Sequence, residues 1–212
     1  MINQASNTEE KFPVLKQALQ HFQTARIRKT YADVVAMPQY AKLGEFFFEQ
    51  IYGPQDFGFR NHSIKSLHHK LSGFLKGEII DGVGKVIELQ DLSDALDEQM
   101  AQLMLEERIR EDLTMEKYAE IYRSLDNYEQ RVYQIDLMVD AVTAIHHISQ
   151  MRFIGWSLKV VSKAAHLAGM GKIIDFLVQG YDAFHSAKDI GFFVQAINQR
   201  EKALNDRLFD AN

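Results

Sequence analysis

The chain has 212 residues, of which 46% are hydrophobic and 25% are charged, and a chain of this size can bury a self-sufficient core. It contains no cysteine, which excludes disulfides, thiolate zinc sites, iron–sulfur clusters and a cysteine nucleophile. Its formal net charge of −5 argues against general binding to nucleic acid or to an anionic membrane surface.

The N-terminal segment 1–11 is polar and lacks the basic start and apolar run of a signal peptide. No apolar run approaches the roughly 20 residues that a membrane span requires. The sequence therefore predicts a cytoplasmic protein with no membrane partner. We expect residues 1–10 to form a flexible tail and residues 11–212 to form a single domain.

Apolar residues recur at intervals of three and four along much of the chain, as they do on one face of an amphipathic helix. The clearest such segments are 86–104, 128–145, 173–184 and 193–208. No segment shows the sustained two-residue alternation that is typical of a half-buried strand. The sequence therefore predicts an all-α, single-domain bundle of eight or nine helices without significant sheet.

Prolines, glycines and one threonine indicate where the helices begin and end. Pro13 is typical of a helix start, and Pro38 should end the first helix, because the residue before a proline avoids the α conformation. We expect a glycine-rich turn over residues 77–84 and an N-cap at Thr114. Glycines within residues 169–171 should separate two C-terminal helices.

Two features bear on self-association. Residues 77–136 carry sixteen acidic and six basic residues, and this acidic region either faces solvent or meets the basic N-terminal third, within one molecule or across a homodimer. Small residues at Gly180, Ala183, Ala187 and Gly191 would allow a second helix to approach closely. A tight crossing within the molecule is favoured for this stripe, and a homodimer seam is the alternative.

Residues 46–61 contain five phenylalanines, a tyrosine and a Gly-Pro turn, and so many aromatic rings belong in a core or an interface. Asp56 and Arg60 are charges in this apolar setting, and burying either one alone would be costly. We therefore expect a packed corner in which the two residues form a salt bridge. The alternative is one wall of a ligand pocket in which Arg60 binds an anion.

The segment Tyr-Gly-Pro-Gln-Asp-Phe at residues 52–57 resembles the motif "YGPxDF" of an uncharacterised family of bacterial all-helical proteins. Further segments that share the resemblance are Arg26-x-Arg28 with Tyr31-Ala32-Asp33, Tyr118-Ala119 with Tyr122-Arg123, residues 180–184, and Arg200-Glu201. The resemblance covers most of the chain and implies an all-helical fold. It implies no activity.

The sequence predicts neither a catalytic site nor a metal site. No glutamate is followed by a histidine three residues later, as a di-iron bundle requires, and Asp182 with His185 is the nearest approach to such a pair. There is no nucleophile elbow and no phosphate-binding loop. We expect no cofactor. The basic segment 26–31 is interpreted as an ordinary surface, which makes nucleic acid an unlikely partner.

Taken together, these features favour a non-catalytic cytoplasmic helical scaffold or protein-interaction protein. The alternative is a helical protein, binding or enzymatic, with a pocket for a small anionic ligand near the aromatic corner. The residues that we assign to such a pocket are Tyr52, Asp56, Arg60, Tyr122, Arg123 and Arg152.

Overall fold

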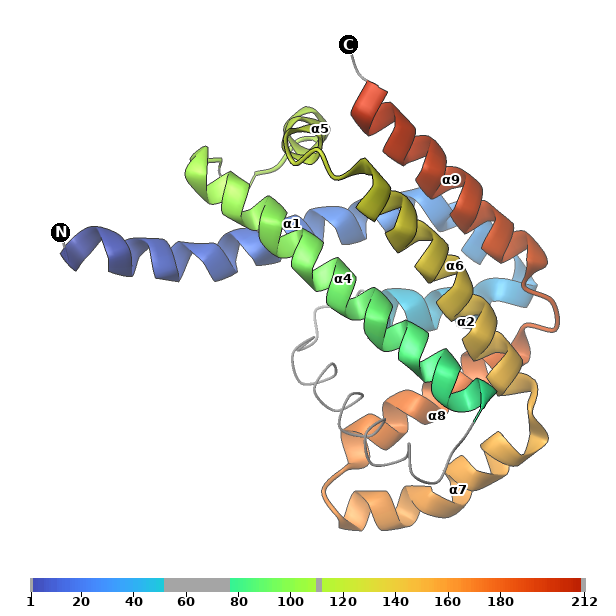
Figure 1. Ribbon diagram of the computed structural model, residues 1–212. Coiled ribbons are helices and arrows are strands. Elements are labelled where there is room, and N and C mark those ends of the chain that lie inside the picture. The colour runs from blue at the N-terminus through green and yellow to red at the C-terminus, as the bar shows by residue number, and fades with distance from the viewer. Residues whose placement is uncertain (1, 52–76, 110–111, 211–212) are drawn as a thin grey trace.

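The computed structural model describes residues 2–51, 77–109 and 112–210, with side chains from Lys11 onward (Figure 1). The α-helices of these residues are α1 (Ile2–Val35), α2 (Ala41–Phe46), α4 (Glu78–Glu106), α5 (Met115–Ser124), α6 (Tyr128–Gln150), α7 (Arg152–Leu167), α8 (Gly171–Ser186) and α9 (Gly191–Asp210). A 3₁₀ turn (Pro38–Tyr40) and a π-helical turn (Phe47–Ile51) flank α2. Within the described ranges there is no strand, and the predicted all-α fold is confirmed.

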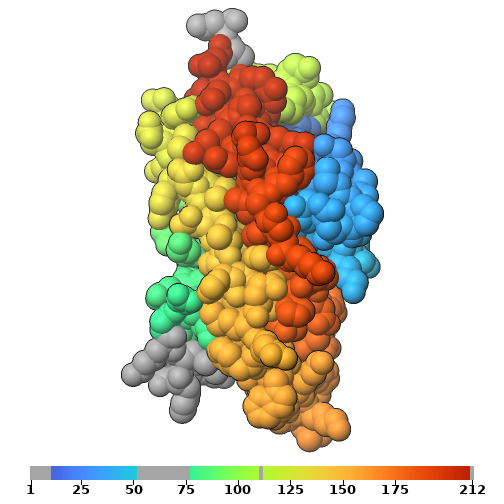
Figure 2. All heavy atoms as spheres, turned by 90° about the vertical axis from the view of Figure 1, so that its right-hand side faces the viewer, coloured from blue at the N-terminus to red at the C-terminus, as the bar shows by residue number. Residues whose placement is uncertain are grey.

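The central layer consists of α4, α6 and α9, with α6 packed between the other two (Figure 1). Helix α1 passes across this layer and packs mainly on α4. Helices α7 and α8 form a hairpin at one end of an elongated molecule, where α7 lies at the outer surface (Figure 2). Of the helices in the described part of the chain, none combines the length and the apolar composition needed to span a membrane.

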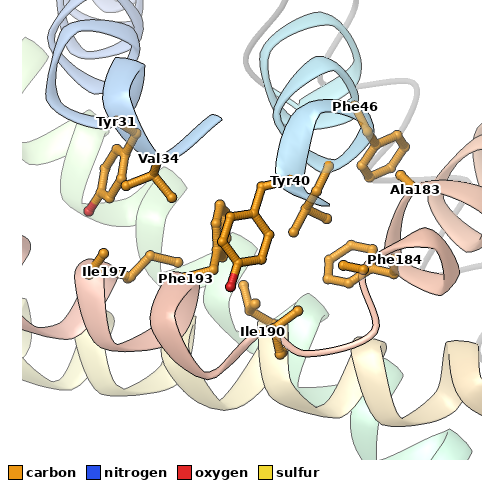
Figure 3. Packing of buried hydrophobic residues seen from close by; sticks show 13 residues of the cluster. Tyr31, Val34, Tyr40, Phe46, Ala183, Phe184, Ile190, Phe193 and Ile197 are labelled. Atoms are coloured by element: carbon orange, nitrogen blue, oxygen red, sulfur yellow. The ribbon is translucent and has the colours of Figure 1, made fainter. Parts of the chain in front are cut away.

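One apolar cluster joins the end of α1 and helix α2 to α8 and α9 (Figure 3). Tyr40 lies at its centre and is 1% exposed, and its ring is 5.6 Å from that of Phe193. Phe46 packs against Phe184 and Phe176 with ring centroids 6.4 and 5.3 Å away. The first part of the predicted aromatic corner is therefore in the core, whereas residues 52–61 lie outside the described ranges.

A second apolar cluster joins α1, α4, α5 and the end of α9. Leu19, Met100, Met104 and Ile121 are completely buried in it. The two methionines belong to the C-terminal end of the apolar stripe predicted over residues 86–104, and this end packs with residues of α1 and α5. Burial of such a stripe is the main source of helix stability in water, because isolated helices are marginal.

Several predicted boundaries are confirmed. Met37, before Pro38, is extended with φ −69° and ψ 129°, and α1 has ended at Val35. The Thr114 hydroxyl accepts a hydrogen bond from the backbone N–H of Lys117 at 3.3 Å, as an N-cap does. Gly169, with φ 75°, separates α7 from α8.

Two predicted boundaries are wrong. Pro13 lies inside α1 rather than at a helix start, since the backbone is helical from Ile2. Flexibility of residues 1–10 stays a prediction. The expected turn over residues 77–84 is helical after Gly77, which has φ 67° and precedes α4. Gly82 serves close packing instead, because a Cβ there would lie 2.7 Å from Cδ1 of Ile148 on α6.

Of the four small residues in the predicted stripe, Gly180 and Ala183 lie on α8, Ala187 follows its end, and Gly191 begins α9 and is exposed, so the stripe does not extend along one helix. A Cβ at Gly180 would lie 2.9 Å from Cζ of Phe46, and Ala183 and Ala187 are 4% and 0% exposed. This close approach of α2 and α8 matches the intramolecular crossing that the sequence favoured. The homodimer stays a prediction.

Helices α1 and α4 also pair charges within the molecule. Lys16 donates hydrogen bonds to Glu98 at 3.0 Å and lies 2.7 Å from Asp94. These carboxylates raise the pKa of Lys16 against the opposing effect of its burial. Part of the acidic middle region therefore meets the basic N-terminal third inside one molecule.

Candidate functional site

Five polar residues bring α1 and α9 together, and we call them the ionic cluster: Arg26, Tyr31, Asp33, Arg200 and Glu201. Glu201 is 9% exposed, and both of its carboxylate oxygens accept hydrogen bonds from Nη1 of Arg26 at 2.7 Å. The Tyr31 hydroxyl donates a third hydrogen bond to the same carboxylate at 2.8 Å. This buried carboxylate is thus neutralised and hydrogen-bonded, as the cost of its desolvation demands.

Arg200 lies on the outer, more exposed side of the same contact between α1 and α9. Its Nη1 and Nη2 donate to the two oxygens of Asp33, each at 2.7 Å, in a bidentate pair. Nη1 also donates to the carbonyl oxygen of Thr30 at 2.5 Å. The Arg200 hydrogen bonds hold the pKa of Asp33 at about 2, well below its usual 3.8. Arg200 is therefore a fixed cation whose direction is set by α1.

A second group of polar residues joins α5, α6 and α9. The Tyr122 hydroxyl donates to Oδ1 of Asn205 at 2.8 Å, and the Arg131 guanidinium lies 4.4 Å from the Tyr122 ring centroid. Arg131 is 3% exposed, and its Nη1 donates to Gln134 at 3.3 Å. Burial raises the pKa of Tyr122 far above its usual 10, so its phenol stays neutral over the whole physiological range.

Asp97 lies on α4 close to this second group. Gln23 and Gln20 donate to its carboxylate from α1, at 3.0 and 3.4 Å. Burial raises the pKa of Asp97 above 3.8, although these hydrogen bonds and the charges of Arg131 and Lys16 oppose the shift. Asp97 is partly exposed. The surrounding protein nevertheless removes enough water from its carboxylate for burial to be the largest influence on its pKa.

A groove of about 370 Å³ runs beside the ionic cluster, and we call it the α1–α9 groove. Arg26, Thr30, Arg200, Leu204 and Arg207 line it, together with Met115 at the start of α5. A second cavity, of about 430 Å³, lies at the start of α6. Its described lining includes Asp126 and Glu129, whose charges disfavour an anion there.

The residues predicted to form a ligand pocket do not all meet in the described structure. Tyr52, Asp56 and Arg60 lie outside the described ranges. Tyr122 is buried on α5, and Nη1 of the neighbouring Arg123 donates to the carbonyl oxygen of Leu208 at 3.0 Å.

Arg152 begins α7 and is exposed, whereas α5 lies toward the other end of the molecule (Figure 1). The described structure therefore brings Tyr122 next to Arg131 rather than next to Arg152.

The nearest approach to a metal pair, Asp182 and His185, lies on α8. Nδ1 of His185 is 2.7 Å from the carbonyl oxygen of Ser149, and its ring stacks on that of Tyr181 at 5.1 Å. The histidine therefore ties α8 to the end of α6. Among the residues that the structure describes, no group of three or more histidine and acidic side chains is arranged to hold a metal ion.

The sequence did not single out Arg131, Asn205, Arg26 or Arg207 as site residues. Glu201 was noted only as part of a shared segment. The burial of Glu201 and Asn205 could have been predicted, because these two residues continue the helical spacing of the buried residues Ile197 and Leu208 on α9. A polar residue on an apolar helix face is expected to be buried and therefore hydrogen-bonded. For Arg207, which is exposed, no such signal exists.

A family model described as Domain of unknown function (DUF8198) matches residues 3–212, and the chain belongs to this family. No curated protein and no solved structure matches the chain. Membership in a family of unknown function agrees with the resemblance inferred from the sequence. The link to a "YGPxDF" motif and to bacteria stays a prediction.

Proposed function

We propose that this chain is a non-catalytic helical interaction protein of the cytoplasm that binds another protein through one side of α7. The binding surface, which we call the α7 face, consists of Phe153, Trp156, Val160 and Leu167. These four side chains are 53%, 68%, 54% and 91% exposed. Their spacing of three, four and seven residues places them on one side of the helix. This row of exposed apolar side chains is the observation that carries the proposal.

The opposite side of α7 packs on α8. Gly155 is the buried residue of α7 and contacts the ring and hydroxyl of Tyr181, so a larger side chain would not fit there. Helix α7 lies at one end of the molecule (Figure 1), and the exposure of the four side chains shows that the bundle leaves the α7 face uncovered. Contiguous exposed apolar side chains on a folded protein typically mark an interaction surface.

The charges around the α7 face indicate the chemistry of the partner. Residues 141–174 contain no acidic residue and four basic ones, among them Arg152, Lys159 and Lys163 on α7 itself. A partner with an apolar surface bordered by acidic residues would complement this region and be attracted to it at long range. Two copies joined through their α7 faces would bring like charges together, which favours a different protein as the partner.

The hydrogen-bonded polar groups of the α1–α9 contact and of α5 support a role without catalysis. Glu201 and Arg200 are each engaged by a partner of opposite charge, and Tyr122 is hydrogen-bonded and has a raised pKa. A general base or nucleophile needs a pKa near the working pH and access to a substrate. The alternative, a ligand pocket near residues 52–57, depends on residues outside the described ranges and stays a prediction.

Site-specific crosslinking tests the proposal. A photoreactive residue at position 160 should crosslink an acidic protein in extracts of the source organism, whereas one at position 14 should not. Val14 is the matched control because it is also an exposed valine, at 43%, but lies on α1. Equal crosslinking from both positions, or crosslinking chiefly to a second copy of the chain, would contradict the proposal.

The crosslinked protein is then produced separately and its binding is measured. Trp156 is the single tryptophan of the chain, so its fluorescence reports on the α7 face directly. We expect the purified partner to shift the emission of Trp156 to shorter wavelength and to bind more weakly at high salt. Val160→Glu should abolish binding, and Val14→Glu should leave it unchanged. Equal binding by the two variants would refute the assignment of the surface.

A further inference from the structure

We infer that the α1–α9 groove is a binding site for a small organic anion, a phosphate monoester or a carboxylate with an apolar body. This inference goes beyond the proposed function, because the groove lies on helices other than α7. It differs also from the pocket predicted near residues 52–57. The argument rests on three arginines and one apolar wall.

Two of the arginines are held in place by carboxylates that lie beside the groove. Glu201 binds Nη1 of Arg26 at 2.7 Å, and Asp33 binds Arg200 through both terminal nitrogens at 2.7 Å. A guanidinium that is already fixed loses little conformational entropy when it binds an anion. Because these carboxylates neutralise Arg26 and Arg200, the two arginines add no net charge. Arg200 uses three of its five N–H groups for Asp33 and Thr30, which leaves directed donors on Nε and Nη2.

The third arginine supplies the net charge. Arg207 lines the groove from α9, about two helical turns beyond Arg200. Its side chain is exposed and makes no hydrogen bond or ion pair with the residues that the structure describes. None of the described lining residues carries a carboxylate. Among the described residues nothing compensates the charge of Arg207, and a groove with this net charge selects against cations and for anions.

The other residues that line the groove determine which chemical group the bound anion can carry. Met115, Ala203 and Leu204 form an apolar wall, and Thr30 and Gln199 are neutral hydrogen-bonding residues. The volume of about 370 Å³ is at the small end of ligand sites in proteins. An aromatic or short aliphatic group against the apolar wall would bring a phosphate or carboxylate to the arginines.

Phenyl phosphate is a suitable probe because it combines a ring with a dianion. The full chain labelled with ¹³C at its methionine methyls is titrated with it, and Met115→Leu identifies the Met115 signal. We expect phenyl phosphate to shift this signal in a saturable way. Phenol, which lacks the anion, and inorganic phosphate, which lacks the ring, should each bind about tenfold more weakly or worse.

Arg207→Ala should weaken phenyl phosphate binding about tenfold, and Arg207→Lys should retain part of it. Because Arg207 is exposed, both variants should fold, which an unchanged midpoint of urea unfolding verifies. Arg152→Ala removes an exposed arginine from the other end of the molecule and should bind like the wild type. Val160→Glu should also bind normally, which separates this site from the α7 face.

The inference is overturned if the Met115 methyl does not respond, or if phenol binds as well as phenyl phosphate. Equal losses in Arg207→Ala and Arg152→Ala would likewise overturn it, because binding would then follow net charge alone. Unchanged affinity in Arg207→Ala would show that the groove does not hold the anion.

Discussion

Replacing Glu201 by glutamine tests how strongly the ionic cluster stabilises the fold. The substitution keeps the shape of the side chain and removes its charge, so the Arg26 guanidinium loses its counter-ion. The two side chains are 10% and 18% exposed. Breaking a buried ion pair from one side costs about 3–5 kcal/mol, and the partial exposure of Arg26 places our expectation near 3 kcal/mol.

Urea denaturation measures this loss as a lower unfolding midpoint at an unchanged slope. Thermal unfolding should show a decrease of about 6–12 °C, since 1 kcal/mol corresponds to about 2–4 °C for a chain of this size. Glu98→Gln is the matched control, because Glu98 also pairs with a basic residue of α1 but is 55% exposed. We expect it to lose less than about 1 kcal/mol.

The double variant Arg26→Met with Glu201→Leu completes the test. Replacing both charges of a buried pair with apolar residues is often neutral or stabilising, so this variant should be more stable than Glu201→Gln. Equal stability of Glu201→Gln and Glu98→Gln would refute the reasoning, because the pair would then behave like one at the surface. A double variant that is less stable than Glu201→Gln would also refute the reasoning, because an apolar pair would then be worse than a single unpaired charge.

Three further predictions concern single positions. Gly180→Ala should lower the free energy of unfolding by about 1–3 kcal/mol, because its Cβ would meet the aromatic ring of Phe46 on α2. Gly84→Ala has open space around it and should raise the free energy of unfolding by about 0.5–1 kcal/mol. Urea unfolding measures both changes. Tyr122→Phe should cost about 1–3 kcal/mol in the same assay, because Asn205 loses its buried hydrogen-bond donor. Asp33, whose pKa is lowered from 3.8 to about 2 in the folded state, stabilises the fold above pH 3.8, and this contribution disappears as the pH falls toward about 2. The stability difference between wild type and Asp33→Asn should therefore be larger at about pH 5 than at about pH 2.

Each of these predictions has a contrary outcome. A Gly180→Ala variant that is more stable than the wild type would mean that α2 and α8 can move apart without a loss of packing energy. A Tyr122→Phe variant as stable as the wild type would show that Asn205 finds another donor. A difference between wild type and Asp33→Asn that grows toward low pH would mean that the folded-state pKa of Asp33 is raised rather than lowered.

The sequence was informative where structure depends on residues close together in the chain. The apolar spacing over residues 86–104 predicted α4, because one helix face must be covered to be stable in water. Thr114 and Pro38 marked boundaries because their effects on the backbone are local. The glycines of residues 77–84 were misinterpreted, since a glycine that allows a turn and one that allows a helix crossing look the same in the sequence.

The candidate sites were less predictable. Glu201 and Asn205 interrupt an apolar stripe, and this could have marked them as buried polar residues. Their partners could not have been named, because Arg26 and Glu201 are 175 positions apart in the chain. The predicted ligand residue Arg152 lies at the opposite end of the molecule from α5, because the intervening helix α6 runs the length of the central layer (Figure 1).

The sequence by itself determined the helical class, most of the helix positions and the absence of thiol chemistry, since all three depend on composition or on spacing within about twenty residues. Only the tertiary structure decided which charges meet, which glycines allow helices to cross and which apolar side chains remain uncovered. These properties depend on how helices far apart in the chain pack against each other. The α7 face shows the difference plainly: its apolar residues resemble core residues in the sequence, and only the placement of α7 at the edge of the bundle leaves them exposed.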